Sequence, residues 1–115
     1  MESKIRKLDA QYAKSIISTW KTNHRITCLL IENIPKELWI EKVPGIDRKS
    51  VRMIAGHIHN TRCMWIKMLG AKHRLTIPSG VNRFKVNPEL LLSALGQSSK
   101  GMIDLIKSDL NKVAN

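Results

Sequence analysis

Three long segments of the chain place their apolar residues three or four positions apart, which is the spacing of one face of an α-helix. The segments are residues 51–70, residues 88–113 and approximately residues 9–33. The rest of the chain shows no convincing strand pattern. A helix with one apolar face must bury that face against another element. The sequence therefore predicts an all-α fold, an up-down helix bundle of three long helices.

Length and composition limit the chain to one domain, which we expect to span residues 1–115. The longest apolar runs are far shorter than the roughly 20 residues that a membrane-spanning helix needs. The N-terminal residues lack the apolar stretch of a secretory signal. The two cysteines suit neither a disulfide framework nor a CxxC metal site. These features predict a cytoplasmic protein without a membrane partner.

The expected helices have recognisable ends. Pro35 ends the first one, because the residue before a proline avoids helical geometry. Ser50 is a good N-cap for the second helix, and Gly70 is placed to end it. Asn87 and Pro88 suit the N-cap and first positions of the third. The connections are then residues 36–49, with a short turn at 36–39, and a long, basic loop over residues 70–87.

The second helix is expected to bury a broad apolar stripe. On a helical wheel, His57 lies about 60° from the centre of this stripe and can point inward, whereas His59 lies about 140° away and should be exposed. Cys63 lies almost opposite the stripe, and His24 leans inward on the first helix. The stripe itself consists of Val51, Ile54, Ile58, Thr61, Trp65, Met68 and Leu69.

The chain resembles the DinB/YfiT-like family of four-helix bundles, which are often described as metal-dependent enzymes. The resemblance extends over residues 12–113, and most of the matching positions are core residues. The matching residues are Trp20 and Asn23, then Ile34, Pro35, Glu37 and Trp39, then Ser50, Val51, Ile54–Ile58 and Trp65, and finally Asn87–Leu91.

The resemblance implies a divalent metal, Zn²⁺ or Ni²⁺, and an enzyme of the thiol-transferase or hydrolase type. Family members commonly hold the metal with three histidines, of which one corresponds to His57. The other two form a pair on a fourth helix, and this sequence has neither that pair nor that helix. The implied metal site is therefore incomplete, and we expect little or no activity from this chain. We assign no catalytic residue.

Reasoning from the residues alone leaves several roles open for His57. It can be a histidine at the edge of the core, or a ligand in a site that a second chain completes. It can also join His24 and a third ligand from His73, Asp9 or Asp104, because a catalytic zinc usually takes three protein ligands and a water.

Charge is the most unusual global property, with a net value of +11. Nine basic and no acidic residues lie between Arg48 and Lys85. Arg48, Lys49 and Arg52 surround the start of the second helix, where Ser50 adds a hydroxyl and the free N–H groups favour anions. We expect an anion-binding site there. Nucleic acid is a less favoured partner, because few aromatic side chains interleave with the basic ones.

Three helices of a four-helix bundle would leave an apolar groove uncovered, and such patches usually indicate association. We expect a homodimer to cover the groove. The alternative to the enzyme is therefore a non-catalytic, dimeric helical scaffold that binds an anionic partner or nucleic acid through residues 48–85. The lack of a firm cap at the C-terminus is also typical of a truncated chain.

Overall fold

The computed structural model describes residues 2–46 and 48–114, with side chains over 10–46 and 48–110. Three long helices, α1 (Glu2–Glu32), α2 (Val51–Gly70) and α3 (Pro88–Ala114), make up most of this part of the chain. Two single 3₁₀ turns follow α1 and α2, namely η1 (Lys36–Leu38) and η2 (Ala71–His73). The predicted three-helix bundle is confirmed. The first helix begins earlier than expected, at Glu2 rather than near residue 9.

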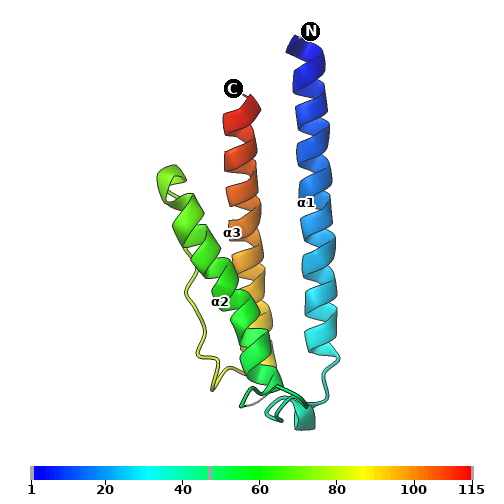
Figure 1. Cartoon of the computed structure of the whole chain (residues 1–115), viewed down its shortest axis with the longest axis vertical. Coiled ribbons are helices and arrows are strands. Elements are labelled where there is room, and N and C mark those ends of the chain that lie inside the picture. Colours follow the sequence, from blue (N-terminus) through cyan, green and yellow to red (C-terminus); the bar gives the residue numbers. More distant parts are fainter. Residues whose placement is uncertain (1, 47, 115) are drawn as a thin grey trace.

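The helices form an elongated bundle in which α3 lies between the other two (Figure 1). The described part of the chain measures 57 × 25 × 25 Å. From the end where α1 meets η1, both α2 and α3 run back antiparallel to α1, so they are parallel to each other (Figure 1). The expected up-down order is therefore wrong for α3. A parallel pair needs a long return, which residues 74–87 provide. α1 and α2 each pack mainly against α3 and have few contacts with each other.

The predicted helix starts are confirmed by their hydrogen bonds. The Ser50 hydroxyl accepts the backbone N–H of Met53 at 3.2 Å, and the Asn87 side chain accepts that of Leu90 at 2.7 Å. Each bond satisfies one of the free N–H groups in a first helical turn. Gly70 is the last residue of α2 but does not reverse the chain. The reversal occurs after η2, at Arg74, whose backbone is left-handed with a φ of 55°.

The largest apolar core lies at the end of the bundle where both connections gather. It contains Ile31, Trp39, Ala55, Val86, Leu91 and Leu95. The indole N–H of Trp39 donates to the carbonyl oxygen of Val86 at 2.8 Å. This bond satisfies the buried indole and fastens the first connection to the residues that lead into α3. The opposite end of the bundle is less tightly packed around α1, where Tyr12 is largely exposed.

The side of α2 that is buried differs from the predicted one. The helix packs toward α3 and the return segment through Ala55, Gly56, His59, Arg62, Cys63, Ile66 and Gly70, which are buried. Much of the expected core stripe is exposed instead, including Ile58, Trp65, Met68 and Leu69. The reason is that residues 74–87 cover the side of α2 that a helical wheel assigns to solvent. His59 and Cys63 are therefore inside, contrary to prediction.

Candidate functional site

An apolar groove opens between α1 and α2. Near the closed end it forms a cavity of about 250 Å³, whose lining contains no charged side chain. The lining residues are Thr27, Leu30 and Ile31 of α1, Ile34 and Val43 of the first connection, and Val51, Ile54, Ala55 and Ile58 of α2. We call Leu30, Ile54, Ile58, Trp65 and Leu69 the open apolar face. Leu30 is 66% and Trp65 is 45% exposed, so these side chains are able to contact another molecule.

The open apolar face continues along α2 beyond the cavity. Ile54, Ile58, Trp65 and Leu69 are spaced by four, seven and four residues, which keeps them on one stripe of the helix. The stripe is thus the strongest apolar feature of α2, and the described part of the chain leaves most of it without a partner. A contiguous exposed apolar patch of this kind usually marks an interaction surface.

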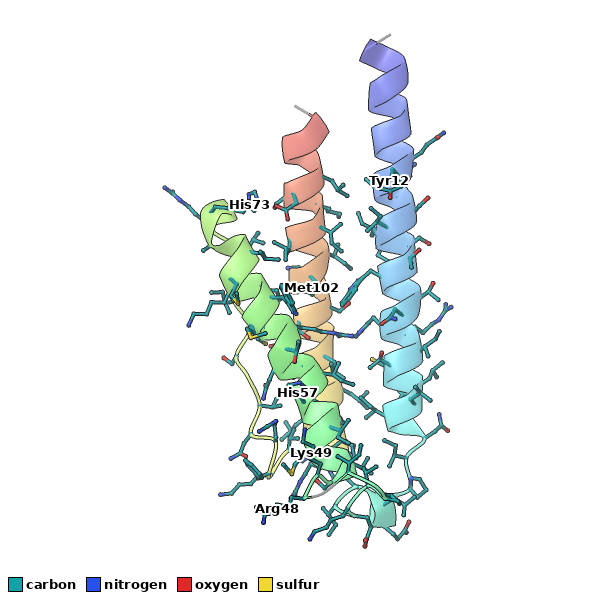
Figure 2. The ribbon with its side chains drawn as sticks, viewed as in Figure 1. Tyr12, Arg48, Lys49, His57, His73 and Met102 are labelled. Carbon is teal, nitrogen blue, oxygen red and sulfur yellow. The ribbon has the colours of Figure 1, made fainter. Side chains whose placement is uncertain are left out.

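The residues of the predicted anion site surround the start of α2 as expected, but their roles differ. Arg48 and Lys49 are exposed (Figure 2). Ser50 is buried and its hydroxyl already caps the helix. The Nε atom of Arg52 is buried, and no described group bonds to it. The site remains a prediction, in which Arg48, Lys49 and Arg52 would provide the charge and Ser50 would shape the helix end.

The structure places His57 on the solvent side of α2, so the expected inward orientation is wrong (Figure 2). Its Nε2 atom lies 3.3 Å from the hydroxyl of Thr61, one turn along the same helix. Within the described residues, no three His, Cys, Asp or Glu side chains come together in a way that could hold a metal ion. The ligand set implied by the family resemblance therefore does not fit the residues around His57.

The buried histidine of α2 is His59, whereas burial was expected for His57. The His59 side chain is completely inaccessible to solvent. Nε2 lies 2.7 Å from the carbonyl oxygen of Ser79, which can only accept, so Nε2 carries the proton and donates it. Nδ1 lies 3.0 Å from the hydroxyl oxygen of Ser98, which also bonds to the carbonyl oxygen of Leu95. His59 thereby joins α2, α3 and the return segment, and its burial argues for a structural role.

Cys63 packs beside His59, with its sulfur 3.3 Å from Nε2. Burial raises the pKa of the Cys63 thiol, and a hydrogen bond to the backbone opposes this effect. A raised pKa keeps the sulfur protonated and therefore a weak nucleophile at neutral pH. The contact with the imidazole is a packing contact and does not resemble an activated thiol.

Arg62 crosses the interior from α2 to the other two helices. Its guanidinium lies 4.9 Å from the centre of the Trp20 ring and donates to His24 Nδ1 at 3.1 Å and to the Leu95 carbonyl oxygen at 3.4 Å. The indole N–H of Trp20 donates to the hydroxyl of Ser99 at 3.1 Å. A π face and neutral acceptors therefore surround a charge that proteins usually bury only with a partner.

No described carboxylate forms an ion pair with Arg62, since both ion pairs of this part of the chain involve Asp109. Burial, followed by the charge of Arg62, lowers the pKa of His24 below its ordinary value. The neutral ring is the form that can accept the Arg62 N–H. His24 does lean inward as predicted, but it serves as a partner for Arg62 and not as part of a cluster with His57.

Sequence reasoning missed both Arg62 and His59 as interior residues. A signal was present, because Ala55, His59, Arg62 and Ile66 recur every three or four residues beside the stronger apolar stripe. Small residues at Ala55 and Gly56 let the neighbouring backbone approach closely, and an added Cβ at Gly56 would lie 3.4 Å from the Cα of Arg83. Because this second stripe contains the polar residues His59 and Arg62, a helical wheel based on hydrophobicity does not assign it to the core.

Comparison of the chain with protein-family models, with curated proteins and with solved structures finds no match of any of the three kinds. Over the described residues, every helix is too short or too polar to cross a membrane. The candidate functional site therefore rests on the geometry of the chain itself, in which the open apolar face is an exposed apolar stripe without a partner in the described residues.

Proposed function

We propose that this chain is a non-catalytic helical scaffold that pairs with a second copy of itself along the open apolar face. The observation that carries the proposal is the exposure of the apolar stripe on α2. Ile58, Trp65 and Leu69 would cost little to expose singly, but a continuous stripe beside an apolar cavity favours a protein partner. A stable interface buries about 800 Å² per partner, and a long helix face is able to supply an area of that order.

The uncharged lining of the cavity is compatible with a second copy as the occupant. The net charge of +11 opposes self-association, so the contact surface must at least exclude like charges. The cavity lining contains only apolar side chains and one threonine. Two copies can therefore meet there without bringing their lysines and arginines into the interface, and without the desolvation penalty of buried charge.

The proposal keeps the resemblance to the DinB/YfiT-like family as a prediction about architecture. In a four-helix bundle each helix packs against two neighbours. Here α3 has neighbours on two sides, whereas the open apolar face lies between α1 and α2. A helix of the second copy would take the place that a fourth helix has in such a bundle.

The test is the mass in solution, measured by light scattering across a hundredfold range of protein concentration. We expect about twice the chain mass of 13.1 kDa at the upper end of the range. The double variant Ile58→Ser/Leu69→Ser should remain monomeric throughout. The matched control Met64→Ser removes an exposed apolar side chain from the other side of α2 and should still form dimers.

Two results would overturn the proposal. If the wild-type protein is monomeric at every concentration, the open apolar face is not a dimer interface. Elemental analysis that finds stoichiometric Zn²⁺ or Ni²⁺, lost in His57→Ala, would contradict the non-catalytic part and favour the enzyme that the resemblance implies.

A further inference from the structure

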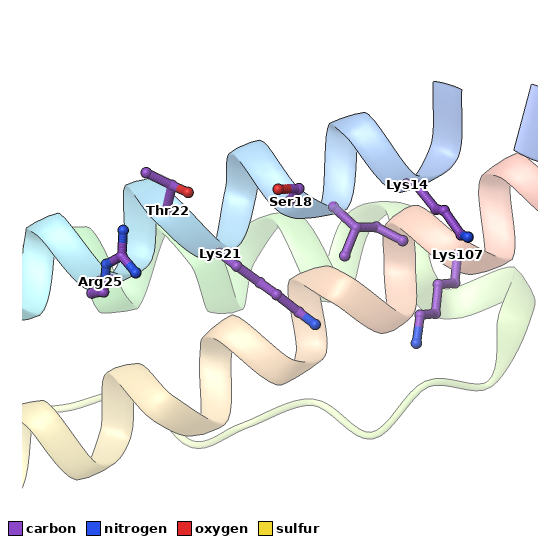
Figure 3. A pocket seen from close by; sticks show the side chains of 7 residues that line it. Lys14, Ser18, Lys21, Thr22, Arg25 and Lys107 are labelled. Carbon is purple, nitrogen blue, oxygen red and sulfur yellow. The ribbon is translucent and has the colours of Figure 1, made fainter. Parts of the chain in front are cut away.

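A second surface, on the other side of the α1–α3 pair, carries a concentration of positive charge. A cleft of about 530 Å³ runs between the two helices (Figure 3). We call it the basic cleft. It is lined by Lys14, Ile17, Ser18, Lys21, Thr22 and Arg25 of α1 and by Lys107 of α3. Four of these seven side chains are cationic and none is acidic.

The cations of the basic cleft lack counter-ions within the described part of the chain, where both ion pairs join Asp109 of α3 to Lys72 or His73 after α2. Lys21 and Arg25 are one helical turn apart, an arrangement that is unfavourable for like charges. Lys107 adds a further cation from α3 to the same cleft. A cluster that breaks a local rule without an evident gain in stability is often a functional site.

The cations follow a straight line along α1. Lys14 and Lys21 are seven residues apart, and Arg25 follows four residues later, which keeps the three on one stripe of the helix. At a rise of about 1.5 Å per residue, Lys14 and Arg25 are separated by about 16 Å along the helix axis. That length is comparable to the axial span of about five phosphate steps of a duplex strand at about 3.4 Å each, so the three cations of α1 can each face a different phosphate.

The other lining residues distinguish between anionic ligands. Ser18 and Thr22 place hydroxyls between the cations, and hydroxyls next to lysine and arginine are frequent phosphate contacts. Ile17 is the single large apolar side chain in the lining, which is too little for an acidic amphipathic helix that needs a row of apolar anchors. No aromatic side chain lines the basic cleft, so it has no platform on which bases could stack.

We propose that the basic cleft binds the phosphate backbone of a nucleic acid without reading its sequence. Lys14, Lys21, Arg25 and Lys107 neutralise separate phosphates, and the two hydroxyls bond to phosphate oxygens. The site is separate from residues 48–85, where an anion site was expected from the sequence. It is also separate from the open apolar face, so binding there and self-association are tested independently.

The experiment measures binding of a fluorescently labelled DNA duplex of random sequence by anisotropy, at several salt concentrations. We expect the double variant Lys21→Gln/Arg25→Gln to bind at least tenfold more weakly at low salt. The slope of log affinity against log salt should fall by about one for each cation removed. The control Lys36→Gln/Lys42→Gln makes the same change of net charge in the exposed first connection and should bind nearly as well as the wild type.

A second pair of variants tests whether the position of the added charge matters, because both variants change the net charge equally. Ser18→Glu introduces a carboxylate into the basic cleft, whereas Ser93→Glu introduces one at an exposed position near the start of α3. We expect only Ser18→Glu to abolish binding. If each variant and its control lose the same amount of DNA affinity, the loss depends on net charge and not on the basic cleft, and the proposal is overturned. Polyglutamate that competes as well as an unlabelled duplex would assign the basic cleft to acidic proteins instead.

Discussion

Burial separates two histidines that lie only two positions apart on α2. His57 faces solvent, and its Nε2 atom lies close to the hydroxyl of Thr61 one turn away. His59 is enclosed and bonded through both ring nitrogens, to Ser98 and Ser79. The two residues therefore provide a matched pair, with the same side chain on the same helix in opposite environments.

We predict that His59→Ala destabilises the fold by about 2–4 kcal/mol, because it leaves a cavity and two polar groups without their partner. His57→Ala should change the free energy of unfolding by less than about 0.5 kcal/mol. Urea denaturation followed by circular dichroism measures both values. Equal losses from the two substitutions would contradict the structural role of His59.

The contact between Arg62 and His24 predicts a dependence of stability on pH. The pKa of His24 is lowered in the folded protein, first by burial and then by Arg62. The unfolded chain therefore binds more protons between the two pKa values, and stability rises with pH in that window. The contribution is complete above the ordinary pKa of about 6.5 and is lost as the pH falls through the folded value.

We predict that the wild type loses stability as the pH falls from neutral into this window, and that His24→Gln reduces this loss. Glutamine can still accept the Arg62 N–H through its amide oxygen and does not titrate. Thermal melts at a series of pH values provide the measurement. The same pH dependence in both proteins would show that a different group is responsible.

At the scale of the elements, α3 contains two glycines in contrasting surroundings. A Cβ added at Gly96 would meet nothing within 4 Å, whereas one at Gly101 would lie 2.6 Å from the Cδ1 atom of Ile66, which is fully buried. Both glycines weaken an isolated helix equally, by about 1 kcal/mol relative to alanine. Only Gly101 is also needed for the close approach of α2.

We expect Gly96→Ala to stabilise the protein by about 0.5–1 kcal/mol, because alanine reduces the entropy of the unfolded chain and suits a helix. Gly101→Ala should stabilise less or destabilise, since Ile66 must move to make room. Chemical denaturation of the two variants is compared directly. A larger gain at Gly101 than at Gly96 would contradict the described packing of α2 on α3.

The ends of the helices could be predicted from the sequence, but the side of α2 that is buried could not. Local chemistry determines a cap, so Ser50 and Asn87 are recognisable from their neighbours alone. Which side of a helix is buried depends on distant parts of the chain, and here the return segment covers His59 and Cys63. The basic cleft was missed for a similar reason, since Lys107 comes close to Lys14 only after α3 has packed on α1.

At the scale of the whole molecule, charge and shape together predict an effect of salt. At about 10 mM ionic strength the Debye length is about 30 Å, which exceeds the 25 Å width of the bundle. The charges behind a net value of +11 then repel one another across the molecule. At about 150 mM the Debye length is about 8 Å, and only neighbouring charges interact.

We therefore predict that the melting temperature rises when sodium chloride is increased over this range. The variant Lys36→Gln/Lys42→Gln, which has two fewer positive charges, should show a smaller rise. Differential scanning fluorimetry provides the measurement. A melting temperature that falls with added salt would mean that attractive ion pairs outweigh the repulsion.

The central place of α3 has a consequence for synthesis on the ribosome. α1 and α2 rely on α3 for most of their packing, and α3 is the last of the three to leave the exit tunnel. At about 5–20 residues per second, the nascent chain carries two unpaired amphipathic helices until α3 follows. Folding of the three helices is then concerted and waits for α3, and ribosomes that stall before α3 release a chain that chaperones must hold.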